Sequence, residues 1–153
     1  MGKAQAPRPG EILGVDHLGI AVRSIDSTLG FYEGVLGLTC EHIEEVAGQQ
    51  VRAAFLRAGP SSIELVEPTS PESAVARFLD KRGEGIHHLA FKVEGIDESL
   101  SRAKGQGIKL VDASPRLGAR GCLVAFLHPS SCHGVLVEFV EAPHARGAGA
   151  PAR

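Results

Sequence analysis

The sequence has few of the features that mark a secreted, membrane or nucleic-acid-binding protein. Its 153 residues include three cysteines and no tryptophan, and the formal net charge is −2. Three cysteines without a Cys-x-x-Cys spacing exclude a disulfide framework, so we expect reduced thiols and a cytoplasmic protein. No apolar run reaches the roughly 20 residues that cross a bilayer, and residues 1–10 lack the apolar stretch of a signal peptide. Lys and Arg are scattered, so we expect neither a nucleic-acid partner nor a membrane partner.

What the sequence does contain is a repeat with an offset of 71 residues. Residues 14–22 read GVDHLGIAV and residues 85–93 read GIHHLAFKV. The match places His17 and His88 at the same position of two modules. Two equivalent histidines in a pseudo-twofold fold are well placed to hold one metal ion between them.

A second match lies at the end of each module. Residues 63–68 read IELVEP, and residues 137–143 read VEFVEAP. Glu64 and Glu138 therefore occupy equivalent positions, each in an apolar strand. A carboxylate on the inner face of a sheet is costly unless it meets a cation. The alternative is that each glutamate points to solvent, but the coincidence with two matched histidines favours a site.

The predicted metal ligands are thus His17, Glu64, His88 and Glu138. Two imidazoles and two carboxylates suit one divalent ion such as Co²⁺, Ni²⁺, Zn²⁺ or Mn²⁺, with coordination positions left open. Strand alternation predicts that His87 points to the opposite face from His88. The repeat aligns His87 with Asp16, and we interpret both as surface residues or as residues that support the ligands from behind.

Apolar periodicity and turn residues predict the order β-α-β-β-β in each half. The expected strands of the first half are 15–22, 38–46, 51–58 and 62–67, with a helix over 25–36. A short helix over 72–81 links the halves. The second half should have strands at 86–93, 108–112, 122–127 and 135–140, with a helix from 96 to 103.

The expected fold is therefore α+β: two tandem βαβββ modules forming one curved, mostly antiparallel sheet with helices outside. We expect a single domain over residues 12–143, with modules of about 12–70 and 84–143. Neither half buries its apolar face alone, so the two should share a core. Residues 1–11 and 144–153 are rich in Pro, Gly and Ala and should form flexible tails.

These features resemble the vicinal oxygen chelate superfamily, also called the glyoxalase, bleomycin resistance and dioxygenase superfamily. Within it the chain is most similar to the methylmalonyl-CoA epimerases. The similar segments span almost all of residues 12–143, and they are residues 15–22, 63–68, 76–79, 85–91, 114–121, 126–129 and 134–138. The Gly-Ile-His-His and Leu-His-Pro elements are the more specific among them.

The resemblance implies a metal-dependent epimerase that interconverts (2R)- and (2S)-methylmalonyl-CoA. A proton leaves C2 and returns to the other face through a metal-stabilised enolate. The family's metal ligands fall on the same four residues, and an acyl-CoA partner and a homodimer are implied. Glu138 is the first candidate for the base and Glu64 for the opposite face, with Gln50 or water as weaker options. Some members carry a second base at a position that aligns with Ala53, which cannot move a proton.

Other activities also fit parts of this pattern. A glyoxalase I-type lactoylglutathione lyase has a similar set of two histidines and two glutamates. An extradiol dioxygenase needs two histidines and one carboxylate, and Glu64 as a fourth ligand argues against it. A metal-free small-molecule binding protein is the non-enzymatic alternative. The Gly and Arg content of the loop at 114–121 suits either a cover that contacts the carboxylate of the substrate or the phosphates of coenzyme A, or a solvated turn with surface arginines. Ethylmalonyl-CoA differs from methylmalonyl-CoA by one methylene.

Overall fold

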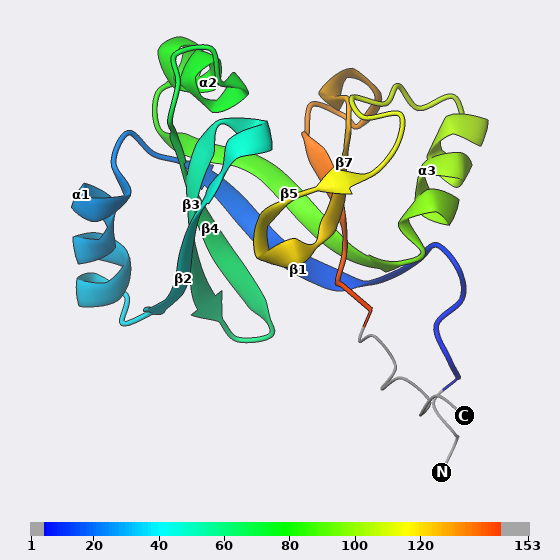
Figure 1. The fold of residues 1–153 in the computed structure, drawn as a ribbon, viewed down its shortest axis with the longest axis horizontal. Coiled ribbons are helices and arrows are strands. Elements are labelled where there is room, and N and C mark those ends of the chain that lie inside the picture. The colour runs from blue at the N-terminus through cyan, green and yellow to red at the C-terminus, as the bar shows by residue number, and fades with distance from the viewer. Residues whose placement is uncertain (1–4, 145–153) are drawn as a thin grey trace, which may run out of the picture.

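Eight strands form one curved sheet in the computed structural model, which describes residues 5–144 (Figure 1). The strand order is β2-β3-β4-β1-β5-β8-β7-β6. The strands are β1 (Glu11–Ala21), β2 (Thr39–Val46), β3 (Val51–Ala58), β4 (Ser61–Pro68), β5 (Gly85–Glu94), β6 (Arg116–Leu117), β7 (Leu123–Leu127) and β8 (Val137–Glu141). The helices of the described residues are α1 (Ile25–Leu29), continued by a π-helical turn (Gly30–Val35), α2 (Ala74–Arg82) and α3 (Ile96–Gly105), with short 3₁₀ turns at Ala47–Gln49, Ala119–Gly121 and Pro129–Ser131.

The two modules meet at the centre of the sheet. There β1 pairs with β5 in antiparallel orientation, so one continuous sheet passes from one module to the other. The pairs β1–β4 and β5–β8 are parallel, and the remaining pairs are antiparallel. The predicted α+β class and the mostly antiparallel curved sheet are confirmed.

The helices lie on different faces of this sheet. Helix α1 packs by Ile25 on Leu56 and Leu65, and α3 packs by Ile96 and Leu100 on the corresponding face of the second module. Helix α2 packs by Val75 and Leu79 on the other face of the first module. That inner face of the curved sheet carries the predicted ligands.

The last strand of each module also fixes the start of a helix. Glu67 of β4 accepts a hydrogen bond from the Ile25 backbone N–H, and Glu141 of β8 accepts from the Ile96 backbone N–H. Carboxylates are stabilising at helix N-termini because the free N–H groups and the helix dipole favour negative charge. The repeat aligned these two glutamates, but their capping role needs the packed helices.

Some predicted elements are wrong in detail. The expected strand at 108–112 is absent as a ladder: it makes one isolated bridge, Leu110 with Leu127. The Val111 and Asp112 backbone N–H groups both donate to the Phe126 carbonyl, and the Asp112 carboxylate accepts the Phe126 N–H at 2.8 Å, so the pairing is irregular there. Strand β1 begins at Glu11 rather than at residue 15, and Arg102 donates to the Gly10 carbonyl next to it. The tail expectation for residues 1–4 and 145–153 falls outside the described residues.

Within residues 5–144, none of the helices combines the length and apolar character needed to cross a membrane.

Candidate metal centre

The four predicted ligands converge on the inner face of the sheet, one from each of the four central strands. His17 comes from β1, Glu64 from β4, His88 from β5 and Glu138 from β8, and all four are buried. The His17 and His88 Nε2 atoms are 3.0 Å apart. Glu64 Oε2 lies 2.9 Å from His17 Nε2 and 3.0 Å from His88 Nε2. Glu138 Oε2 lies 3.2 Å and 3.0 Å from the same two nitrogens.

The pairing of β1 with β5 produces this convergence. Across the ladder His17 faces Ala90, and Gly19 faces His88. Gly19 must lack a side chain, because a Cβ there would stand 2.0 Å from the His88 ring. The Phe55 ring lies edge-on to His17 at 5.8 Å between centroids, and the equivalent Phe126 lies edge-on to His88 at 5.5 Å. Two aromatic side chains therefore flank the polar cluster, one beside each histidine.

Matched β-bulges correct the sequence prediction for His87. The β1–β5 register gains one residue at Asp16 on β1 and one at His87 on β5. A bulge re-aims a side chain, so His87 does not simply point to the far face as alternation predicted. Instead its Nδ1 lies 2.9 Å from His88 Nδ1, and Asp16 Oδ2 lies 2.7 Å from His17 Nδ1. The residue before each histidine thus contacts that histidine's outer nitrogen.

Burial and mutual charge interactions shift the pKa values of all four side chains in the cluster. Burial alone lowers the pKa of His88, but hydrogen bonds and charge from Glu138 and Glu64 raise it to about 9. The same carboxylates, together with Asp16, raise the pKa of His17 well above its usual range despite burial. Burial opposes ionisation of Glu64 and Glu138, yet the two histidines hold both carboxyl pKa values below their ordinary range. Without a metal, two protonated imidazoles thus balance two carboxylates, and a divalent ion would take the place of the imidazole protons.

The outer partners of the two histidines differ in charge. Burial and the nearby His88 lower the pKa of His87 to about 4, so this ring is neutral near pH 7. Burial raises the pKa of Asp16, but His17 and Arg120 lower it overall. An anionic carboxylate therefore supports His17, whereas a neutral imidazole supports His88.

The donor set fits a divalent metal ion. The four side chains offer donor atoms that all lie within 4.8 Å of one another. Nitrogen and oxygen ligands at about 2.1 Å from a common ion sit about 3 Å apart when adjacent, which matches the measured separations. Glu138 Oε2 is buried, and its partners among the described residues are the two imidazole nitrogens, with which it forms ion pairs. Such an oxygen is suited to binding a cation.

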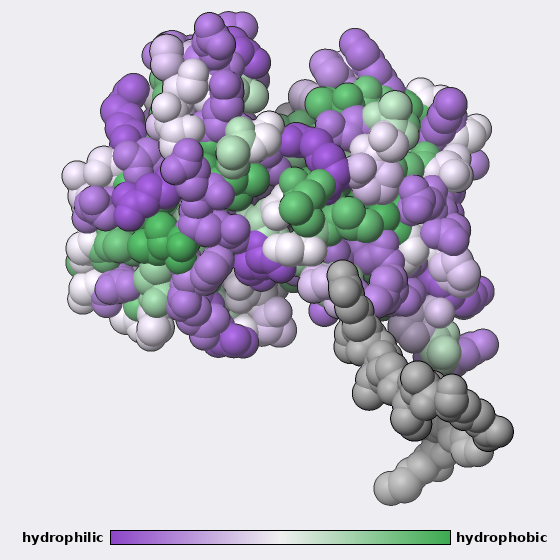
Figure 2. Space-filling model, in the orientation of Figure 1, coloured by the Kyte–Doolittle hydropathy of each residue, from purple (hydrophilic) through white to green (hydrophobic). Residues whose placement is uncertain are grey.

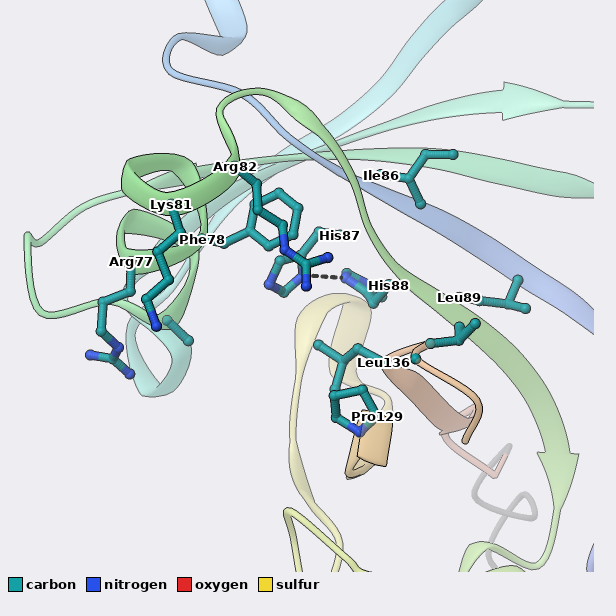
Figure 3. Close-up of a pocket in the computed structure, with 13 residues that line it drawn as sticks. Arg77, Phe78, Lys81, Arg82, Ile86, His87, His88, Leu89, Pro129 and Leu136 are labelled. Carbon is teal, nitrogen blue, oxygen red and sulfur yellow. Dashed lines mark hydrogen bonds between the residues drawn. The ribbon is translucent and has the colours of Figure 1, made fainter. Parts of the chain in front are cut away.

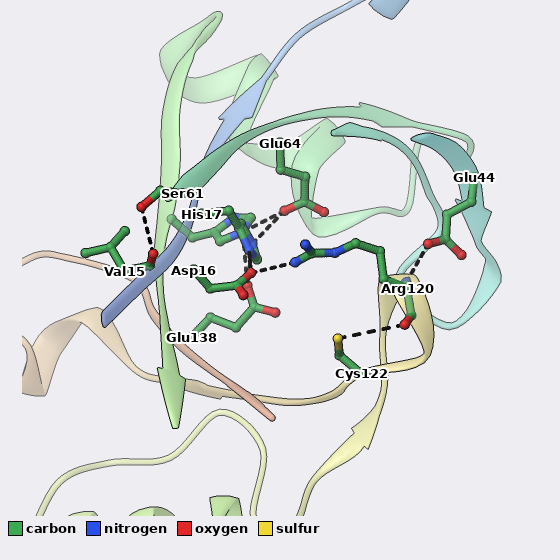
Figure 4. A network of polar contacts seen from close by, with 10 residues as sticks. Val15, Asp16, His17, Glu44, Ser61, Glu64, Arg120, Cys122 and Glu138 are labelled. Carbon is green, nitrogen blue, oxygen red and sulfur yellow. Dashed lines mark hydrogen bonds and ion pairs between the residues drawn. The ribbon is translucent and has the colours of Figure 1, made fainter. Parts of the chain in front are cut away.

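Arg120 is a neighbour of the cluster that the repeat could not indicate. It lies in the 3₁₀ turn between β6 and β7, and its Nη2 donates to Asp16 Oδ2 at 2.5 Å (Figure 4). The equivalent turn of the first module, Ala47–Gln49, carries no arginine, and 104 residues separate Arg120 from Asp16. Ala53, by contrast, is fully buried in an apolar cluster with Val66 and Val75, so no acid or base occupies the position that aligns with the family's second base.

A surface groove reaches the cluster at one of its residues, His88. It has a volume of about 390 Å³ and runs between α2 and the loop at residues 129–136, with His88 at its inner end (Figure 3). Arg77, Lys81 and Arg82 of α2 line the outer part. Figure 2 shows a notch there, with both polar and apolar side chains on its rims. The arrangement places a candidate metal centre at one end and three cations at the other.

This fold and site define a class of protein. The chain belongs to the glyoxalase/bleomycin resistance protein/dioxygenase superfamily, whose family model matches residues 16–126.

Particular relatives narrow the comparison. The uncharacterized protein YqjC of Bacillus subtilis (strain 168) is 46% identical over 83% of this chain and 91% of its own length. The mitochondrial methylmalonyl-CoA epimerase of Bos taurus is 33% identical over 84% of this chain and 74% of its own length. A solved methylmalonyl-CoA epimerase in complex with methylmalonyl-CoA and NH4+ is 37% identical, covers 88% of this chain and 97% of its own, and has a TM-score of 0.85.

Proposed function

We propose that the protein is a metal-dependent methylmalonyl-CoA epimerase. The observation that carries the proposal is the buried set of two histidines and two glutamates at the junction of the modules, in a chain similar to methylmalonyl-CoA epimerases. Acyl-CoA chemistry also suits the groove, because its outer end presents Arg77, Lys81 and Arg82 to the phosphates of coenzyme A.

His17, Glu64, His88 and Glu138 would hold the divalent ion. When bound, the ion supplies Lewis-acid stabilisation of the enolate oxygen that forms as C2 loses its proton. Asp16 keeps the His17 proton on Nδ1, so that Nε2 faces the cluster with its lone pair. The phenyl rings of Phe55 and Phe126 exclude water and so strengthen every charge interaction inside.

Proton transfer falls to the two glutamates. Glu138 takes the proton from C2, since its Oε2 is buried inside the cluster beside both imidazoles and its strand lies in the centre of the sheet. Glu64, related to it by the pseudo-twofold arrangement, must first bind a proton from solvent, because its carboxyl is otherwise anionic, and it returns that proton to the opposite face. Both carboxyl groups then exchange protons with solvent, which restores their starting protonation states. A carboxylate ligand acting as a base must loosen from the ion during turnover.

Deuterium exchange at C2 of methylmalonyl-CoA tests this proposal. In deuterated water the wild-type protein should exchange the C2 proton, and a chelator should abolish that exchange. Glu138→Gln should abolish exchange as well. Glu141→Gln is the matched control, since the same change three residues along β8 keeps an oxygen for the helix cap. Retained exchange in Glu138→Gln would overturn the role of Glu138.

The same preparations should be assayed with the hemithioacetal of methylglyoxal and glutathione, because the donor set also suits a glyoxalase I-type lyase. Turnover of that substrate without C2 exchange would replace the epimerase proposal. Elemental analysis showing no stoichiometric metal in active protein would instead overturn the metal-dependent mechanism.

We also propose a homodimer in solution. The first half of β1 exposes Ile12, Leu13 and Val15, each more than 40% accessible. Contiguous apolar side chains of this kind mark interaction surfaces. Sedimentation equilibrium should give twice the chain mass, and a monomer at micromolar concentration would contradict the proposal.

A further inference from the structure

Three separate contacts hold Arg120 beside the candidate metal centre. Its Nη2 donates to Asp16, its guanidinium carbon lies 4.2 Å from the centroid of the Phe55 ring, and its backbone N–H donates to Glu44. These contacts come from β1, β3 and β2 of the first module, whereas Arg120 belongs to the second. Figure 4 shows the side chain extended toward the cluster between the two modules.

The backbone of Arg120 adopts a conformation that suits glycine better. Its φ is 58° and ψ is 23°, in the left-handed region, where a Cβ crowds the following carbonyl. Residues 118 and 121 of the same turn are both glycine. Strained backbone at a non-glycine residue persists where the side chain is needed, and here that side chain is a guanidinium aimed at the cluster.

One hydrogen-bond donor of the Arg120 guanidinium, the Nε–H, is unused within the described part of the chain. Its Nε is buried and finds no hydrogen-bond partner among residues 5–144. A buried donor without a partner is costly, so it calls for a ligand. Asp16 neutralises the charge of the guanidinium and fixes its orientation, and Phe55 supports its face. A guanidinium held in this way is preorganised for a carboxylate, whose planar geometry it matches.

We propose that Arg120 is a specificity-determining residue that binds the free carboxylate of a malonyl-type acyl group. The inference rests on the proposed function, since it concerns the acyl part of the thioester that would enter the groove. Arg120 lies next to Phe55, which contacts His17, so a carboxylate bound to Nε stays beside the four ligands. An acyl group without that carboxylate leaves the donor unpaired and binds more weakly.

Two thioesters that differ by one carboxylate test the assignment. Malonyl-CoA and acetyl-CoA are titrated by calorimetry into the metal-loaded wild-type protein and into Arg120→Met, Arg120→Lys and Arg57→Met. The last variant is the control, because Arg57 is an exposed arginine on the same strand as Phe55 and pairs with Glu41 away from the cluster. Metal content and thermal unfolding are measured for each protein.

Arg120→Met should weaken malonyl-CoA binding by about 10- to 100-fold, the loss typical of a hydrogen bond to a charged group. Acetyl-CoA affinity and metal content should stay at the wild-type level, and Arg120→Lys should recover part of the preference. Equal weakening of both thioesters, or no change in either, would overturn the assignment while leaving the epimerase proposal intact. Wild-type protein that binds neither thioester would overturn the epimerase proposal and this assignment with it.

Discussion

Replacing Gly19 with alanine should remove His88 from the metal centre without unfolding the protein. Gly19 faces His88 across the β1–β5 ladder, and its φ lies outside the left-handed region, so alanine fits the backbone. The new Cβ would stand 2.0 Å from the ring Cε1, 2.3 Å from Nδ1 and 2.5 Å from Nε2. Strands β1 and β5 are both held in the centre of the sheet, so the imidazole of His88 has to move rather than the backbone.

The size of the effect follows from these distances. Ordinary van der Waals contact with a Cβ begins at 3.4 Å, so the imidazole has to withdraw by more than an ångström. Metal–ligand distances tolerate only about 0.2 Å of change. We therefore expect metal affinity to fall by at least about 10- to 100-fold, the range seen when even an outer partner of a ligand is lost. Overpacking should lower the free energy of unfolding of the metal-free protein by about 1–3 kcal/mol.

Cobalt(II) titration followed by visible absorption measures the affinity, and urea unfolding measures the stability. Gly85→Ala is the matched control, since Gly85 lies on β5 and a Cβ there meets no atom within 4 Å. The control should bind cobalt like the wild type. Wild-type affinity in Gly19→Ala would refute the role of His88 as a ligand.

Three further predictions concern the charges and the core. Because the pKa of His88 is raised to about 9 from about 6.5 when unfolded, its contribution is full below pH 6.5 and is lost as pH rises through 9. The free energy of unfolding of the metal-free protein should therefore fall by up to about 3 kcal/mol between pH 6.5 and 9.5 in urea titrations, and a rising profile would contradict this. Asp16→Asn should weaken zinc binding by about tenfold in a chelator competition, because the charged partner of His17 is lost, whereas exposed Asp26→Asn should not. Leu56→Ala should cost about 2–5 kcal/mol of stability by chemical denaturation, since Leu56 is fully buried beneath α1 while lying outside the cluster; a loss below 1 kcal/mol would contradict that packing role.

The fold was predictable because the sequence contains an internal repeat, with one copy in each module. The doubled His-Leu phrase and the doubled Glu-containing strand carry a period of two, which fixes the face of each side chain within a strand. Pairing the two modules then places equivalent residues near one axis. The structure brings His17, Glu64, His88 and Glu138 together, and the sequence had already selected these four.

The predicted orientation of His87 was wrong because a bulge interrupts alternation locally, whereas the interpretation of His87 and Asp16 as supporting residues agrees with their contacts to His88 and His17. Nothing in the composition of residues 85–88 distinguishes a bulged strand from a regular one. The structure shows the bulge in the register of β1 with β5, where Gly19 faces His88 and Ile20 faces Ile86. The 108–112 segment departs from the prediction for a related reason. Ile108 and Leu110 pack against the core, but the backbone hydrogen bonds to residues 126–128 are too irregular for a ladder, and the Asp112 carboxylate takes the Phe126 N–H.

The sequence by itself determined the two-module architecture and the four donor side chains, since both depend on local periodicity and on the match between the halves. Only the tertiary structure decided what surrounds the donors. Asp16 and His87 turn toward them because the strands bulge, and Arg120 reaches them across 104 residues. A contact such as that of Arg120 with Asp16 occurs once and not in both modules, so the repeat does not reveal it. It depends on how the two modules pack against each other.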